Sequence, residues 1–263
     1  MIVDDRVVRA LEGLIRVGNT HQRACLIGGQ ALRDLYDALR LRIGDDIPAV
    51  RASQDVDLLL SIGSDAESDG ALHAVLQASW EPKIGRPATY VWREDRTVEL
   101  DLATTYAADE PPARAVKISV GGAGRILAYR MIPGWLHDLN LMEPCHGVPL
   151  RRIGLERLRH TALLISKLLA VHASLVASAL PDPPAWMSRL DRDLEDVLYL
   201  TDRRLRPSLW CAACAAKRAE LHRHLDPHIA DIVAAAERPS DSLTQETRAR
   251  LRTVVDGLPL WWR

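Results

Sequence analysis

The sequence lacks phenylalanine, has only four cysteines among 263 residues and carries a formal net charge of −1. We attribute the missing phenylalanine to codon bias and draw no function from it. Four cysteines in a chain of this length do not make the disulfide framework of a small secreted domain. A net charge near zero excludes a global electrostatic field that would attract or repel nucleic acid.

Long hydrophobic runs are also missing. No stretch approaches the ~18 consecutive apolar residues that span a bilayer. The first residues, MIVDDRVVRALEG, are acidic and amphipathic, unlike a secretory signal. We therefore expect a cytoplasmic protein with no membrane partner.

The composition is that of a globular chain, with 48% hydrophobic and 26% charged residues. Its charge is uneven: residues 1–150 hold 16 Lys and Arg against 21 Asp and Glu, and residues 151–263 hold 18 against 14. An acidic part beside a basic part suits a metal site next to a phosphate-binding surface, although chance explains a difference of this size equally well.

Hydrophobic spacing predicts an α/β domain over residues 1–150 and a helical domain over 151–263. The fold class is therefore α+β, a mixed sheet flanked by helices and followed by a helical carboxy-terminal domain. The expected helices cover residues 5–20, 30–42, 70–79, 155–176, 188–202, 208–224, 227–236 and 243–255. The expected strands cover 24–27, 55–62, 89–95 and 97–104, with further short strands between 104 and 150.

Two glycines, Gly28 and Gly29, follow the first strand and open a helix. Such a turn exposes backbone N–H groups at a helix amino terminus, where phosphate binds readily. Gly-Gly turns are common and mostly structural, so this feature has meaning only in combination with others.

Asp55 and Asp57 stand one residue apart at the head of the apolar run LLL. In a strand both carboxylates share one face, where oxygen ligands suit Mg²⁺. A solvated strand end is the alternative. In VELDL, Glu99 and Asp101 alternate with leucines, so a strand beside 55–60 would bring Asp101 to the aspartate pair, with Glu99 as the competing third acid. Three such carboxylates suit two-metal phosphoryl or nucleotidyl transfer.

The segments LIGGQAL, DVDLLL and VELDL together resemble the nucleotidyltransferase superfamily that includes DNA polymerase β. Within it, the chain is most similar to AbiEii-type toxins of type IV toxin–antitoxin systems. These commonly carry Arg-x-Ser/Thr-x-Asp-apolar-Asp, matched here by Arg51, Ser53, Asp55 and Asp57. They also carry a helix with a lysine, matched by Lys167, and then a basic-Asp-x-x-Asp helix, matched by RDLEDVLYL. The resemblance spans residues 25 to about 200.

The resemblance implies a Mg²⁺-dependent transfer of a nucleoside monophosphate from an NTP to a hydroxyl acceptor. In the toxin relatives the acceptor can be the 3′ end of tRNA, and an antitoxin protein is the implied partner. A small-molecule, antibiotic-type nucleotidyltransferase and a non-catalytic nucleotide-binding relative are the alternatives. By the same resemblance, Asp55, Asp57 and Asp101 would bind magnesium, and Asp101 would also accept the proton of the attacking hydroxyl. Gly28, Gly29 and Ser53 would contact the triphosphate. Lys167 would neutralise phosphate charge, and Asp193 would orient Lys167 or the nucleotide.

Two further motifs have plain explanations. Cys211 and Cys214 have the spacing of zinc ligands, with histidines downstream, but they lie in an alanine-rich helical run that favours core packing. Basic clusters such as LRRIGLERLRH could contact an RNA backbone, yet such runs are more often solvated helix faces.

Overall fold

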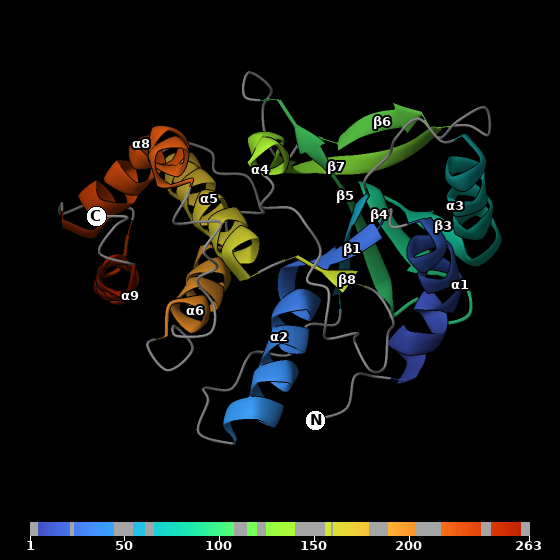
Figure 1. Cartoon of the computed structure of the whole chain (residues 1–263), viewed down its shortest axis with the longest axis horizontal. Coiled ribbons are helices and arrows are strands. Elements are labelled where there is room, and N and C mark those ends of the chain that lie inside the picture. The colour runs from blue at the N-terminus through green and yellow to red at the C-terminus, as the bar shows by residue number, and fades with distance from the viewer. Residues whose placement is uncertain are drawn as a thin grey trace. The chain divides into compact units, whose positions relative to one another are not determined.

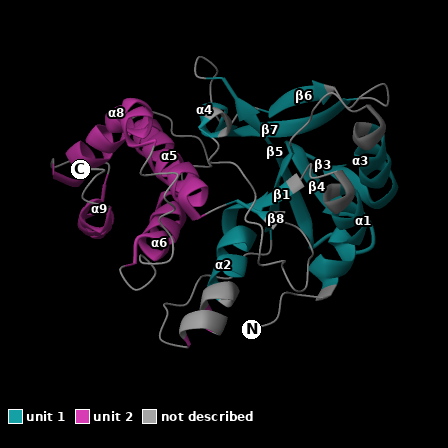
Figure 2. Ribbon diagram, viewed as in Figure 1, with its two compact units in different colours: residues 1–38, 51–159 teal, residues 39–50, 160–263 magenta. Residues whose placement is uncertain are grey.

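The computed structural model describes residues 5–21, 24–44, 55–60, 66–107, 115–119, 125–139, 156–158, 160–178, 189–202, 217–237 and 243–258. The chain forms two compact units, residues 1–38 with 51–159 and residues 39–50 with 160–263 (Figure 2). This division falls after residue 159, whereas the predicted domain boundary lies at residue 150.

The first unit contains an eight-stranded mixed sheet (Figure 1). The order β3-β4-β5-β2-β1-β8 forms its main path, and β7 pairs with both β5 and β6. The strands are β1 (Ala24–Ile27), β2 (Asp55–Leu60), β3 (Trp80–Lys83), β4 (Arg86–Trp92), β5 (Glu99–Tyr106), β6 (Ala115–Ser119), β7 (Arg125–Pro133) and β8 (Glu156–Arg157). The helices that begin in this unit are α1 (Asp5–His21), α2 (Gly28–Ile43), α3 (Ala66–Ser79) and α4 (Trp135–Asp138).

Strands β2 and β5 lie side by side and parallel, which meets the condition on which a cluster of their acids depends. Each alternates between a buried apolar face and an acidic face. Leu100 and Leu102 of β5, like Val56 and Leu58 of β2, have no exposed surface. Because neighbouring strands share their pleat, the acids of both strands lie on the opposite face of the sheet.

The second unit is helical, with α5 (His160–Ser178), α6 (Leu190–Leu200), α8 (Arg218–Glu237) and α9 (Gln245–Gly257). Helix α5 contacts α6 and α8, and α9 contacts both α6 and α8. A mixed sheet with helices, followed by a helical unit, confirms the predicted α+β class.

Helix α5 is long and apolar enough to cross a membrane, with a mean hydropathy of 1.6 over an 18-residue window. No membrane-spanning segment is predicted from the sequence. Of that window, 56% is buried inside the protein. A buried core helix meets the same criteria, so α5 by itself is weak evidence for a membrane segment.

Three differences between the expected and the observed elements bear on the fold. The helix expected over 155–176 begins at His160, because residues 156 and 157 instead pair in parallel with β1. Strand β3 was not predicted. The helix break expected before Pro227 is wrong, since α8 continues through this residue. Other residues singled out from the sequence, namely Arg51, Ser53, Cys211 and Cys214, lie outside the described residues.

Candidate active site

One row of side chains crosses four strands of the sheet. Asp101 of β5 pairs in register with Thr89 of β4 on one side and with Asp57 of β2 on the other. Asp57 in turn pairs with Ile27, the last residue of β1. The structure therefore brings Asp57 and Asp101 to adjacent positions on the same face. We call Asp57 and Asp101, with the next register pair on the same face, Asp55 and Glu99, the acid row.

The acid row meets the turn between β1 and α2 at Gly28. Gly28 has a φ of +64°, a left-handed conformation that glycine adopts without strain. A Cβ at this position would lie 2.1 Å from Oδ2 of Asp57. The Asp57 carboxylate therefore lies against the first residue of α2, where the helix dipole stabilises negative charge.

Asp101 is held by two donors. Thr89, which is fully buried, donates its hydroxyl to Oδ1 of Asp101. Arg86 lies with Nη2 3.0 Å from Oδ2. A carboxylate accepts hydrogen bonds through both of its oxygens, so donors on Oδ1 and on Oδ2 help to fix its orientation. Asp101 is 5% exposed, and a charge so buried requires such partners.

The cations of the acid row come from the β3–β4 hairpin. Arg86 begins β4 and lies with Nη1 3.0 Å from Oε2 of Glu99, and Lys83 at the end of β3 pairs with the other oxygen of Glu99. Burial on its own lowers the pKa of Arg86, but Asp101 and Glu99, together with Tyr129, raise it by more. Arg86 therefore stays charged and binds two members of the row.

The acid row fits a magnesium ion in its donor chemistry. Among the residues that the structure describes, no three or more His, Cys, Asp or Glu side chains are gathered to hold a metal ion. Mg²⁺ is commonly held by one or two carboxylates together with substrate phosphates. Asp57 and Asp101 supply that number of hard oxygen ligands, and Gly28 keeps the adjoining space clear of a side chain. Asp55 lies beside Glu99, two register pairs further along.

Lys167 lies in the second unit, at the centre of a buried ion cluster. On α5, its Nζ is 2.9 Å from Oδ1 of Asp193 and 2.8 Å from Oδ2 of Asp196, both on α6. Burial lowers the pKa of Lys167, but the two aspartates raise it by more, so the net shift is upward. The predicted contact between Lys167 and Asp193 is thus present, while a common site with the acid row, which belongs to the first unit, stays a prediction.

Four polar partners of these residues had no predicted role. Arg86, Lys83 and Thr89 bind Glu99 or Asp101, and Asp196 is the second acceptor of Lys167. The spacing of Asp193 and Asp196, three residues apart on a helix, was a usable signal that both face the same neighbour. The donors of the β3–β4 hairpin had no comparable signal, because strand β3 itself was not predicted.

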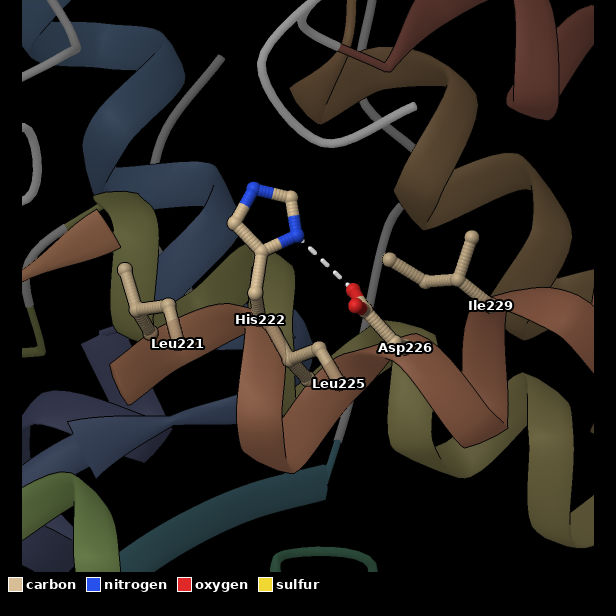
Figure 3. Close-up of a pocket in the computed structure, with 5 residues that line it drawn as sticks. All are labelled: Leu221, His222, Leu225, Asp226 and Ile229. Carbon is tan, nitrogen blue, oxygen red and sulfur yellow. Dashed lines mark hydrogen bonds and ion pairs between the residues drawn. The ribbon is translucent and has the colours of Figure 1, made fainter. Parts of the chain in front are cut away.

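A shallow pocket in the second unit is lined by Leu221, His222, Leu225, Asp226 and Ile229 (Figure 3). In it, Nδ1 of His222 lies 2.8 Å from Oδ1 of Asp226. All five lining residues belong to α8, so this pocket does not bring together side chains from different elements. The acid row remains the stronger candidate.

Comparisons with known proteins leave the family unassigned. No protein-family model matches the chain, and no curated protein matches it either. A solved structure, the crystal structure of an antigenic nucleotidyltransferase-like protein from Paracoccidioides brasiliensis, is similar to it with 13% sequence identity and a TM-score of 0.38. The match covers 86% of this chain and 93% of that chain. At this TM-score the likeness carries no argument about the site.

Proposed function

We propose that the protein is a Mg²⁺-dependent nucleotidyltransferase that moves a nucleoside monophosphate from an NTP to a hydroxyl acceptor. One observation carries the proposal: Asp57 and Asp101 occupy paired positions on β2 and β5, directly beside the glycine turn that begins α2. Two carboxylates next to a helix amino terminus are the parts that magnesium-assisted nucleotidyl transfer requires.

The triphosphate would bind at the amino terminus of α2. Its N–H groups and helix dipole attract an anion, and Gly28 and Gly29 let a phosphate approach the backbone. The carboxylate of Asp57 at the same turn repels phosphate. Mg²⁺ bound by Asp57 and Asp101 would neutralise the charge where carboxylate and triphosphate meet.

Asp101 would accept the proton of the attacking hydroxyl. The acceptor oxygen then forms a bond to the α-phosphorus, the bond from that phosphorus to the bridging oxygen breaks, and pyrophosphate leaves. Thr89 positions the Asp101 carboxylate for this task. Lys167 would offset phosphate charge as a point cation, oriented by Asp193.

The acceptor in this proposal is the 3′ end of tRNA, as in AbiEii-type toxins, with a cognate antitoxin as protein partner and the cytoplasm as location. It rests on the resemblance of DVDLLL, Lys167 and RDLEDVLYL to those toxins, and on the excess of basic residues over 151–263. An RNA backbone binds basic surfaces through its phosphates.

The test incubates the full chain with Mg²⁺, each α-labelled NTP in turn and total cellular RNA. Asp57→Asn and Asp101→Asn are compared with Glu94→Gln, which removes an exposed acid from the turn between β4 and β5. We expect label on tRNA-sized RNA, with transfer reduced on the order of 100-fold or more in Asp101→Asn, the typical contribution of a general base. Glu94→Gln should match the wild type.

Two other outcomes contradict parts of the proposal. Pyrophosphate released only when small hydroxyl compounds are added would replace tRNA by a small-molecule acceptor. Equal nucleotidyl transfer by Asp57→Asn and the wild type would show that the acid row takes no part in the reaction.

A non-catalytic nucleotide-binding protein is the second candidate. The ion pairs of the expected catalytic residues favour it. Asp101 is paired with Arg86, and Lys167 is paired with two aspartates. Binding of Mg²⁺ and NTP without pyrophosphate release, across RNA and small hydroxyl acceptors alike, would select this candidate.

A further inference from the structure

Arg86 has an unusual place for a cation in a site that is expected to bind another cation. Its two terminal nitrogens contact different acids, Nη1 to Glu99 and Nη2 to Asp101, each at 3.0 Å. Asp101 is buried, with 7% of its side chain exposed, whereas the side chain of Arg86 is 32% exposed. The guanidinium is therefore the outer member of the pair, with solvent on one side.

A fixed guanidinium at this position opposes a divalent cation. Both would lie within a few ångströms of the same carboxylate, where like charges repel strongly because little water screens them. The repulsion is relieved when Arg86 turns away from Asp101, and its partial exposure leaves room for this. Its location directly after the hairpin turn at Gly85 places it at the end of β4 rather than in the middle of the strand.

An alternative partner for Arg86 would arrive with the nucleotide. A guanidinium binds phosphate oxygens through two parallel N–H donors, the same geometry that it uses with carboxylates. A triphosphate at the amino terminus of α2 would lie next to Asp57, which is the register neighbour of Asp101. The exchange from carboxylate to phosphate then keeps the charge of Arg86 paired throughout.

We propose that Arg86 is the counter-ion of the acid row in the metal-free protein and becomes a ligand of the triphosphate when metal and nucleotide bind. This inference rests on the proposed function and adds a binding residue to it. It has a thermodynamic consequence: Arg86 opposes binding of the metal alone and favours binding of metal and triphosphate together. The two ligands are therefore positively coupled, and part of that coupling belongs to Arg86.

The test measures two affinities on the full chain. Binding of Mn²⁺ alone is followed by electron paramagnetic resonance, and binding of inorganic tripolyphosphate at saturating Mg²⁺ is followed by calorimetry. Arg86→Met is compared with Arg96→Met, which removes the same charge from an exposed ion pair with Glu81 in the same unit. We expect Arg86→Met to bind Mn²⁺ about fivefold more tightly or better, and tripolyphosphate about fivefold more weakly or worse, as removal of a nearby charge implies. Arg96→Met should change neither affinity by more than about twofold, the effect of an exposed pair.

Arg86→Lys retains the charge and should recover part of the tripolyphosphate affinity without the tight Mn²⁺ binding. Circular dichroism checks that each variant is folded, and Arg86→Gln replaces Arg86→Met if the latter unfolds. Unchanged or weaker Mn²⁺ binding by Arg86→Met, while the wild type binds Mn²⁺, overturns the role of Arg86 and leaves the proposed function standing. Absence of Mn²⁺ binding in both the wild type and Arg86→Met overturns the two proposals together.

Discussion

Gly28 has a hydrogen atom where other residues have a Cβ, and both its backbone conformation and its contact with the acid row depend on this difference. The left-handed φ of +64° already disfavours any other residue, and the Asp57 carboxylate occupies the place of a Cβ. We expect Gly28→Ala to cost about 1–2 kcal/mol for the backbone conformation. The displacement of Asp57 adds a further loss of stability and of Mg²⁺ affinity. Urea unfolding and Mn²⁺ titration measure the two effects.

Gly85 provides the matched control, because its φ is +78° and nothing lies within 4 Å of a Cβ built there. Gly85→Ala should show the backbone cost of about 1–2 kcal/mol alone, with unchanged Mn²⁺ affinity. Equal unfolding free energies for the two variants would mean that the contact between Gly28 and Asp57 has no energetic weight.

At the residue scale, the sequence predicts the features that depend on local spacing along the chain. The acidic face of β5, the aspartate pair of β2 and the turn at Gly28 all follow from local spacing, and the structure places them as neighbours. The role of Arg86 does not follow, because its partner Asp101 is reached through a hairpin and a second turn. Side-chain pairs of this kind depend on the register between strands, which is set by the hydrophobic patterns of both strands and by the turn that joins them.

Among the elements, β8 and α2 are joined by a buried ion pair. Nε of Arg157 lies 2.5 Å from Oδ2 of Asp34, and each side chain is only 6% exposed. Since α2 also begins at the acid row, this pair holds the helix whose amino terminus would receive the phosphate. We expect Asp34→Leu or Arg157→Met alone to cost roughly 3–5 kcal/mol, because each leaves a buried charge uncompensated.

The double variant Asp34→Leu with Arg157→Met should recover most of this loss, since replacing both ions removes the desolvation cost. Thermal unfolding of the single and double variants completes the cycle. A double variant that loses the sum of the two single losses would show that the residues act independently of each other.

Strand β8 and helix α8 show why sequence patterns do not predict every element. Strand β8 has two residues and exists only through its pairing with β1, more than a hundred residues away in the chain. The helices expected over 208–224 and 227–236 leave a break before Pro227, which cannot donate a backbone hydrogen bond. However, it lies on the exposed face of α8, where water can solvate the carbonyl that it leaves without a partner. The buried stripe of Leu221, Leu225, Ile229 and Ile232 continues past it.

For the molecule as a whole, the proposed chemistry draws on both units. The acids and the glycine turn belong to the first unit, and Lys167 with its aspartates belongs to the second. Lys167 holds two buried carboxylates together, so its substitution would unfold the cluster as well as remove a charge. Activity lost in a Lys167 variant therefore tests catalysis only when the stability of the second unit is measured beside it.

The two units should also respond differently to acid. In the second unit, Nε2 of His172 lies 2.8 Å from Oδ2 of Asp231, and Nδ1 of His172 lies 3.2 Å from Nδ1 of His228. Only one proton fits between the two Nδ1 atoms of this contact. Burial and the neighbouring His172 lower the pKa of His228, while Asp231 acts in the opposite direction with a smaller effect.

Because the pKa of His228 is lower in the folded than in the unfolded state, the unfolded state binds more protons as the pH falls. The stability that neutral His228 contributes is complete above its ordinary pKa of 6.5 and is lost as the pH falls below this value. Between pH 7 and 5.5, we therefore expect hydrogen exchange, corrected for its intrinsic pH dependence, to lose protection in α5 and α8 more than in β2 and β5. In His228→Gln this difference between the units should disappear, whereas an equal loss in all four elements, or the same loss in the variant, would exclude the histidine pair as its cause.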